Sequence, residues 1–127
     1  MKMEIKHLDA KGNGEVDYDY AHDIILFKVK DREYSKSVEF EDLVLDIDKE
    51  GFITGIQIFN ASNMFKVEKE SLNEIKNWNF EIKVENNVIF VQLTFEIVKR
   101  NKIIERVQNI IRKSPSLLKN SEVCVEV

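Results

Sequence analysis

Residues 43–62, LVLDIDKEGFITGIQIFNAS, form the stretch that most constrains the fold. Two runs rich in Val, Ile and Phe, residues 43–47 and 52–59, flank a polar segment at 48–51. Runs of this composition fit a pleated, half-buried surface. Gly51 supplies the positive φ that a short hairpin loop requires, at little steric cost. The stretch therefore predicts a β-hairpin.

Alternating apolar and polar residues predict further strands on both sides of this hairpin. Asn86-Asn87 predicts a two-residue turn, because Asn tolerates left-handed backbone conformations. The apolar positions change parity at Glu41-Asp42, where we expect a bulge or a brief break. The expected strands lie at residues 3–8, 15–20, 23–30, 37–40, 79–85, 89–97 and 122–127.

A helical period appears in two places. Residues 101–113 carry apolar side chains at i, i+1, i+4, i+7 and i+8, with Asn101 as N-cap and Ser114-Pro115 as the stop. Residues 70–78 place three apolar side chains on one helical stripe. We therefore expect an α+β fold, with a mainly antiparallel sheet of about six to eight strands in hairpins and two or three helices packed on one face.

The chain has 127 residues, which predicts a single domain over residues 1–127 with a hydrophobic core of its own. Its one cysteine, Cys124, excludes an intrachain disulfide. The first four residues lack the apolar core of a secretory signal, and no apolar run approaches the roughly 18 residues of a membrane span. The expectation is a cytoplasmic protein with no membrane contact and no cofactor.

Charge is unevenly placed along the chain. Residues 1–65 carry 8 basic against 14 acidic side chains, a net −6, and residues 66–127 carry 11 against 9, a net +2. Within residues 99–119 the balance is 7 basic against 1 acidic. On a helix, Arg106, Arg112 and Lys113 would form a basic surface for an acidic partner or nucleic acid. A solvated helix face is the alternative interpretation.

Asp46, Asp48 and Glu50 imitate the first half of a calcium loop, with oxygens at alternate positions and Gly51 at the sixth. The flanking residues predict strands rather than helices, and Gln57 stands where a bidentate Glu would be required. Turn chemistry explains the same residues, because hairpin tips favour Asp and Gly.

Asp19, His22 and Asp23 form a second polar group between two predicted strands. A histidine with two carboxylates could carry out acid–base chemistry or hold a metal ion. Turn hydrogen bonds are the alternative, since Asp side chains commonly bond to nearby backbone.

Four motifs follow one another between residues 18 and 62: Tyr18-Asp19, then AHDIIL at 21–26, LDIDKEG at 45–51 and GIQIFNAS at 55–62. Their order and spacing resemble a family of small prokaryotic proteins known as domain-of-unknown-function family 2283. Gln57 and Asn60 depart from it, because the family usually has Glu and Asp there. The resemblance implies no catalytic residue. Some members look like the small partners in toxin–antitoxin-type gene pairs.

The leading functional hypothesis is a non-enzymatic interaction module that self-associates as a homodimer, through an edge strand or a second apolar face. The first candidates for an edge are Val123, Val125 and Val127. The sheet has more apolar side chains than one buried face needs, notably Ile24, Leu26, Ile53 and Phe59.

Two alternatives remain open from the sequence. The chain could be a regulator or antitoxin-like component that binds nucleic acid or a basic partner protein. It could also be a small metal-dependent hydrolase that uses the acidic cluster.

Overall fold

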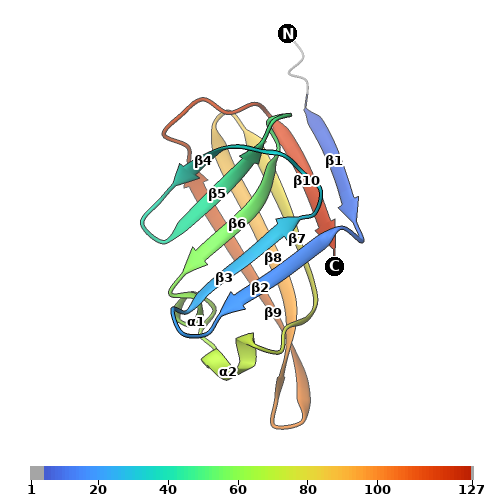
Figure 1. Cartoon of the computed structure of the whole chain (residues 1–127), viewed down its shortest axis with the longest axis vertical. Helices are drawn as coiled ribbons and strands as arrows, with labels where there is room; N and C mark the ends of the chain where they lie inside the picture. The colour runs from blue at the N-terminus through green and yellow to red at the C-terminus, as the bar shows by residue number, and fades with distance from the viewer. Residues whose placement is uncertain (1–4, 127) are drawn as a thin grey trace.

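Two five-stranded β-sheets pack face to face in the computed structural model, which describes residues 5–126 (Figure 1). Sheet I has the order β1 (Lys6–Lys11), β10 (Ser121–Glu126), β7 (Lys76–Glu85), β8 (Val88–Lys99) and β9 (Lys102–Lys113). Sheet II has the order β2 (Gly14–Asp19), β3 (Ile24–Val29), β6 (Ile53–Phe59), β5 (Leu43–Asp48) and β4 (Tyr34–Glu39). Every pairing is antiparallel except that of β1 with β10.

The expected α+β fold is wrong, because the described chain is a β-sandwich. Its helices are α1 (Ala61–Phe65) and α2 (Lys69–Leu72), which are five and four residues long. Both lie in the connection from sheet II to sheet I, at one end of the sandwich (Figure 1). Sheet packs against sheet, so no helix is needed to cover the apolar faces. No helix among the described residues has the length and hydropathy needed to cross a membrane.

Residues 101–113 form strand β9 rather than the expected helix. β9 pairs with β8 without interruption, from Val88 opposite Lys113 to Lys99 opposite Lys102. Arg100 and Asn101 form a two-residue turn with φ of 52° and 63°, so Asn101 is a turn residue and not an N-cap. Twelve cross-strand pairs outweigh the local helical period.

Residues 70–78 are also not one helix. The helical turn α2 ends at Leu72, and β7 begins at Lys76. Leu72 and Trp78 are both buried, at 2% exposure each. Leu72 and Trp78 therefore share one core, but they reach it from a helical turn and a strand rather than from one helix.

The β5–β6 hairpin and the Asn86-Asn87 turn are confirmed. The break expected at Glu41-Asp42 is the turn between β4 and β5. The first expected strand begins at Lys6, and its residues 3 and 4 lie outside the described residues.

The core lies between the two sheets and combines side chains from both. Phe27 of sheet II meets Trp78 of sheet I edge to face, with ring centroids 4.9 Å apart, and Trp78 stacks on Phe80 at 5.7 Å. The chain crosses from sheet I to sheet II at Gly14. A Cβ there would lie 2.8 Å from the Trp78 ring and 2.9 Å from the Glu126 carbonyl oxygen, so this corner requires glycine.

Candidate functional site

Asp48 lies at the tip of the β5–β6 hairpin and is buried, with 3% of the residue exposed. Oδ1 accepts hydrogen bonds from the backbone N–H groups of Glu50, at 2.9 Å, and Phe52, at 3.0 Å. Oδ2 accepts one from Arg32 Nε at 2.8 Å. Both oxygens of this carboxylate therefore accept hydrogen bonds from other groups of the chain.

Arg32 completes the tip. Its guanidinium also pairs with the Glu50 carboxylate and lies over the Phe52 ring, 5.8 Å from the centroid. Burial alone would lower the pKa of Arg32, but its hydrogen bonds to Asp48 and Glu50 raise the pKa above its ordinary value. The buried carboxylate therefore has a permanent counter-charge.

The three carboxylates of the calcium-like stretch point to different partners. Asp46 accepts a hydrogen bond from Ser37 Oγ at 2.8 Å and lies against Gly55 of the neighbouring strand. Asp48 points inward, whereas the side chain of Glu50 is 66% exposed. Within residues 5–126 no group of three or more His, Cys, Asp or Glu side chains is arranged to hold a metal ion.

Asp23 connects the turn between β2 and β3 to helix α1. Oδ1 accepts hydrogen bonds from Tyr18 Oη at 2.6 Å and from the Ser62 backbone N–H at 3.1 Å. Oδ2 accepts one from Ser62 Oγ at 2.6 Å, and the Asp23 carbonyl accepts one from the Ala61 N–H at 3.0 Å. Asp23 adopts a left-handed φ of 54°, which Asp tolerates better than most residues.

These contacts shift two pKa values in opposite directions. Burial tends to raise the pKa of Asp23, but the hydrogen bonds from Ser62 and Tyr18 outweigh it and lower that pKa. Burial and the hydrogen bond to Asp23 raise the pKa of Tyr18. At neutral pH the pair is a phenol that donates to a carboxylate.

The structure does not bring Asp19, His22 and Asp23 together as one cluster. Asp19 and His22 form a separate pair at the surface, with Nδ1 2.8 Å from Oδ2 and side chains 49% and 73% exposed. Hydrogen bonds with His22 lower the pKa of Asp19. Asp19, Asp23 and Asp48 therefore bond to neighbouring turns, whereas Asp46 bonds to Ser37 on the adjacent strand.

The basic residues of β9 are divided between the two faces of sheet I. Arg106 and Arg112 lie on the face toward sheet II, and Lys113 lies on the outer face. Arg112 pairs with Asp42, in the turn between β4 and β5. Arg106 Nε is buried without a hydrogen-bond partner in the described chain. The single basic surface expected on a helix is absent from the described structure.

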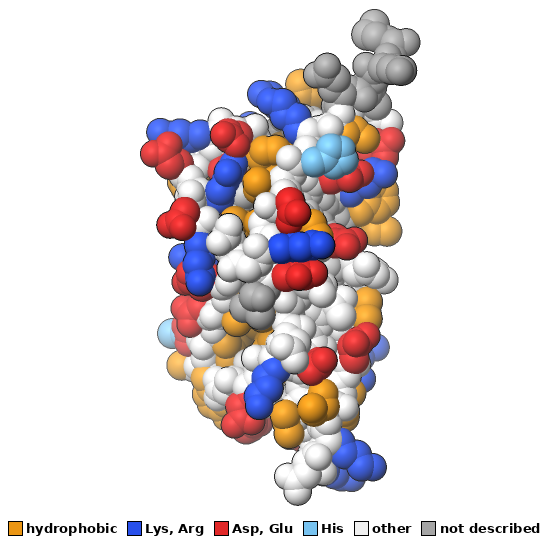
Figure 2. All heavy atoms as spheres, turned by 90° about the vertical axis from the view of Figure 1, so that its right-hand side faces the viewer, with side chains coloured by type: hydrophobic (Ala, Val, Ile, Leu, Met, Phe, Trp, Pro, Cys, Tyr) orange, Lys and Arg blue, Asp and Glu red, His pale blue; other side chains and the backbone are white. Residues whose placement is uncertain are grey.

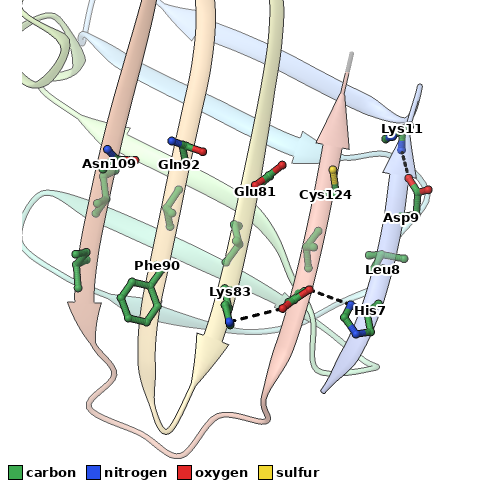
Figure 3. A pocket seen from close by; sticks show the side chains of 16 residues that line it. His7, Leu8, Asp9, Lys11, Glu81, Lys83, Phe90, Gln92, Asn109 and Cys124 are labelled. Carbon is green, nitrogen blue, oxygen red and sulfur yellow. Dashed lines mark hydrogen bonds and ion pairs between the residues drawn. The ribbon is translucent and has the colours of Figure 1, made fainter. Parts of the chain in front are cut away.

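The outer face of sheet I contains a shallow hollow of about 770 Å³ (Figure 3). Its side chains come from all five strands, from His7 on β1 to Ile111 on β9. Glu122 bridges His7 Nδ1, at 3.0 Å, and Lys83 Nζ, at 3.9 Å. The β8–β9 side of the hollow is apolar, with Phe90 beside Ile111.

Cys124 lies in this hollow, on β10. Burial raises the pKa of the Cys124 thiol, so the thiol is protonated at neutral pH. A protonated thiol is a weaker nucleophile than a thiolate.

Strand β9 is the feature that the sequence pattern did not predict. It ends sheet I, and within the described residues β8 is its strand partner. Its outward side chains Ile103, Val107 and Ile111 are 70%, 51% and 59% exposed. The available signal was the apolar side chains at alternate odd positions, but Ile104 and Ile110 on the other face obscured it.

The edge expected at Val123 and Val125 is wrong, because β10 lies between β1 and β7 and both side chains are buried. Val127 lies outside the described residues. Ile53 is buried in the core. Three other apolar residues named from the sequence lie half-buried on the outer face of sheet II: Ile24, Leu26 and Phe59.

Comparison with known proteins places these features in a family. The model of a protein family of unknown function, DUF2283, matches residues 15–62. A Methanosarcina mazei protein, provisionally named a hypoxanthine phosphoribosyltransferase, is 33% identical over 90 residues, or 71% of this chain and 73% of the relative. An uncharacterized Methanocaldococcus jannaschii protein is 30% identical over 115 residues, or 87% of this chain and 97% of the relative. The chain belongs to the DUF2283 family. No solved structure matches it significantly.

The DUF2283 match coincides with sheet II. Residues 15–62 contain β2 to β6 almost entirely and end inside α1, so no strand of sheet I is included. The motif side chains Asp23, Asp48 and Ser62 all make the internal hydrogen bonds described above. The family signature thus specifies how sheet II is held together.

Proposed function

We propose that this DUF2283 protein is a non-enzymatic interaction module that self-associates through strand β9. The single observation that carries the proposal is that β9 is a long edge strand with exposed apolar side chains. It is a twelve-residue edge, regular in register, and it presents three large apolar side chains to solvent. A long, regular, apolar edge is a template for pairing with another strand.

The other edges of the sandwich support the proposal by contrast. β1, β2 and β4 are six residues long each. β4 has an irregular register between Tyr34 and Lys36 and carries mostly polar side chains. Short, polar and irregular edges resist pairing. β9 also carries charged side chains, but it is twice as long as these edges, has no register shift and exposes three large apolar side chains.

The candidate enzymatic groups are engaged within the chain. Asp23 and Asp48 each accept several hydrogen bonds from other parts of the chain, which supports a structural role for both. Phosphate groups, as in a phosphoribosyl substrate, are typically bound by glycine-rich loops at helix N-termini. In the described chain the helices are five and four residues long, and Asn60 and Glu68 precede them. The transferase name of the M. mazei relative therefore gains no support from this geometry.

Of the regulator alternative, binding to nucleic acid has less support than self-association. Arg106 and Arg112 face sheet II, and the protein has a net charge of −4. Acidic and basic side chains are mixed on the face shown in Figure 2. Binding to a phosphate backbone requires clustered positive charge.

The proposal is tested by the mass of the protein in solution. Light scattering at tens of micromolar should give twice the 14.9 kDa of the chain. Val107→Lys places a charge at the middle of the edge and should give the mass of one chain. Thr94→Lys is the matched control, because Thr94 pairs with Val107 from the paired strand β8, and it should remain a dimer. A wild-type mass of 14.9 kDa would overturn the proposal.

A further inference from the structure

The free backbone groups of β9 belong to its odd-numbered residues. The two-residue turn at Arg100-Asn101 makes Lys99 and Lys102 a hydrogen-bonded pair. The backbone N–H and C=O groups of the even-numbered residues of β9 therefore point toward β8. Two carbonyl groups of odd-numbered residues, on the side away from β8, accept hydrogen bonds from side chains of β9 itself. Arg112 Nη1 donates to the Ile111 carbonyl at 2.9 Å, and Gln108 Nε2 donates to the Asn109 carbonyl at 3.4 Å. Each carbonyl oxygen retains a second lone pair for a partner strand.

The sequence of β9 is self-complementary about Val107. In an antiparallel pair with a second copy and a two-fold axis at Val107, Val107 meets its own counterpart. Ile103 then meets Ile111 of the second copy, and Glu105 meets the Asn109 amide. An axis at Glu105 would set two glutamates face to face, and an axis at Asn109 would set Arg106 against Arg112.

The same register also gives the even-numbered side chains, on the face toward sheet II, compatible partners. Ile104 meets Ile110 of the second copy, and Arg106 meets Gln108. Arg106 Nε is buried without a partner in the described chain, and the Gln108 side-chain carbonyl can accept from it. Lys102 would approach Arg112, whose charge is already paired with Asp42.

Strand β8 extends the apolar contacts across both copies. Phe90 pairs with Ile111, and Ile103 pairs with Val98. The pairing would therefore create a row of four apolar side chains across four strands, and the two-fold axis generates a second such row. Apolar cross-strand neighbours on one face stabilise a sheet.

We infer that the homodimer forms by antiparallel pairing of β9 with β9 of a second copy, in the register that places Val107 on the two-fold axis. The inference rests on the proposed function and adds the occupant, direction and register of the contact. It joins the two copies of sheet I into one ten-stranded sheet. The apolar side of each hollow, at Phe90 and Ile111, then borders the other protomer.

Single-cysteine cross-linking tests the register. Cys124→Ser removes the native thiol, and each test cysteine is added to that variant. Val107→Cys should give a covalent dimer with a short bis-maleimide cross-linker, because the Cα atoms of a hydrogen-bonded antiparallel pair are about 5.5 Å apart. Glu105→Cys and Asn109→Cys should each stay monomeric on a denaturing gel, whereas a mixture of the two should cross-link.

The outcomes separate the two proposals. A dimeric mass for Cys124→Ser with cross-linking at Glu105→Cys alone would overturn the register and leave self-association standing. A dimeric mass with no cross-link at Val107→Cys would also overturn the register. A monomeric mass for both wild type and Cys124→Ser would overturn self-association itself.

Discussion

Two hairpins of this protein differ in what their polar and apolar side chains contact. In β5–β6 both strands have neighbours on each side, and Asp48 bonds the tip to Arg32 and to two backbone N–H groups. In β8–β9 the outer strand has one neighbour among the described residues, and Ile103, Val107 and Ile111 face solvent. The first hairpin uses its polar side chains to hold the fold together, and the second exposes apolar side chains to solvent.

The difference explains why the family match is confined to one sheet. Motif residues in sheet II make hydrogen bonds that depend on particular side chains, such as Asp23 to Ser62 and Asp48 to Arg32. The β8–β9 hairpin depends on alternating apolar side chains, which many residue types can supply. A signature over residues 15–62 can therefore specify sheet II and leave β9 outside it.

The largest expected effect is at the tip of β5–β6. Asp48→Ala would leave two backbone N–H groups and the Arg32 guanidinium without their acceptor. We expect a loss of about 3 kcal/mol in the free energy of unfolding. Urea denaturation measures it, and Glu50→Ala, an exposed neighbour, is the control with little change. A loss below about 0.5 kcal/mol for Asp48→Ala would show that the tip contributes little.

Asp23→Ala should cost about 2 kcal/mol, because it removes the acceptor of hydrogen bonds from Tyr18 and Ser62. Acid should reproduce part of this loss. The pKa of folded Asp23 lies below its ordinary 3.8, so on acidification the unfolded chain takes up the proton first. The stability from Asp23 is complete above about pH 5 and is lost as the pH falls through and below 3.8.

Asp23→Asn tests that sign. It should be less stable than wild type at neutral pH, and its stability should fall less steeply between pH 5 and the folded-state pKa. Urea denaturation at a series of pH values measures both slopes. Equal slopes for the variant and wild type would remove Asp23 from the account of acid stability.

A smaller effect is expected at Gly55, within the same hairpin. A Cβ there would lie 3.1 Å from Asp46 Oδ2, so Asp46 would have to move away from Ser37. Gly55→Ala should lose about 1 kcal/mol. In a double-mutant cycle the loss should shrink when Asp46 is also replaced by Ala. Additive losses would mean that the close approach does not matter.

The smallest effect on folding is expected in the second hairpin. Ile103→Ser changes a side chain that is 70% exposed, so unfolding of the monomer should change by less than about 0.5 kcal/mol. The same variant should weaken the dimer, as measured by sedimentation. A large loss of stability without a change in mass would show that Ile103 stabilises the fold rather than a dimer.

Sequence reasoning predicted the first hairpin more accurately than the second, for a physical reason. β5 and β6 have short apolar runs, and Gly51 adopts the expected positive φ of 91°. β9 is an edge strand with apolar side chains on both faces, odd-numbered outside and even-numbered inside. Two interleaved strand patterns gave spacings of i+1, i+4, i+7 and i+8, which also fit a helix.

The polar sites were harder to interpret from sequence, because their geometry depends on contacts across the fold. Asp23 and Ser62 are 39 positions apart, and Asp48 and Arg32 are 16 apart. The sequence placed Asp23 and Asp48 beside turns. It could not show which groups their carboxylates bond to, or that β8 is the one strand paired with β9 among residues 5–126.

Backbone amide exchange in β9, followed by NMR at several protein concentrations, tests the pairing of β9 with β9 of a second copy. We expect the odd-numbered amides of Glu105, Val107 and Asn109 to become protected as concentration rises, while the amides of Arg106 and Gln108 are protected throughout. Rapid exchange at Glu105, Val107 and Asn109 at every concentration, with normal protection in β5 and β6, would contradict it.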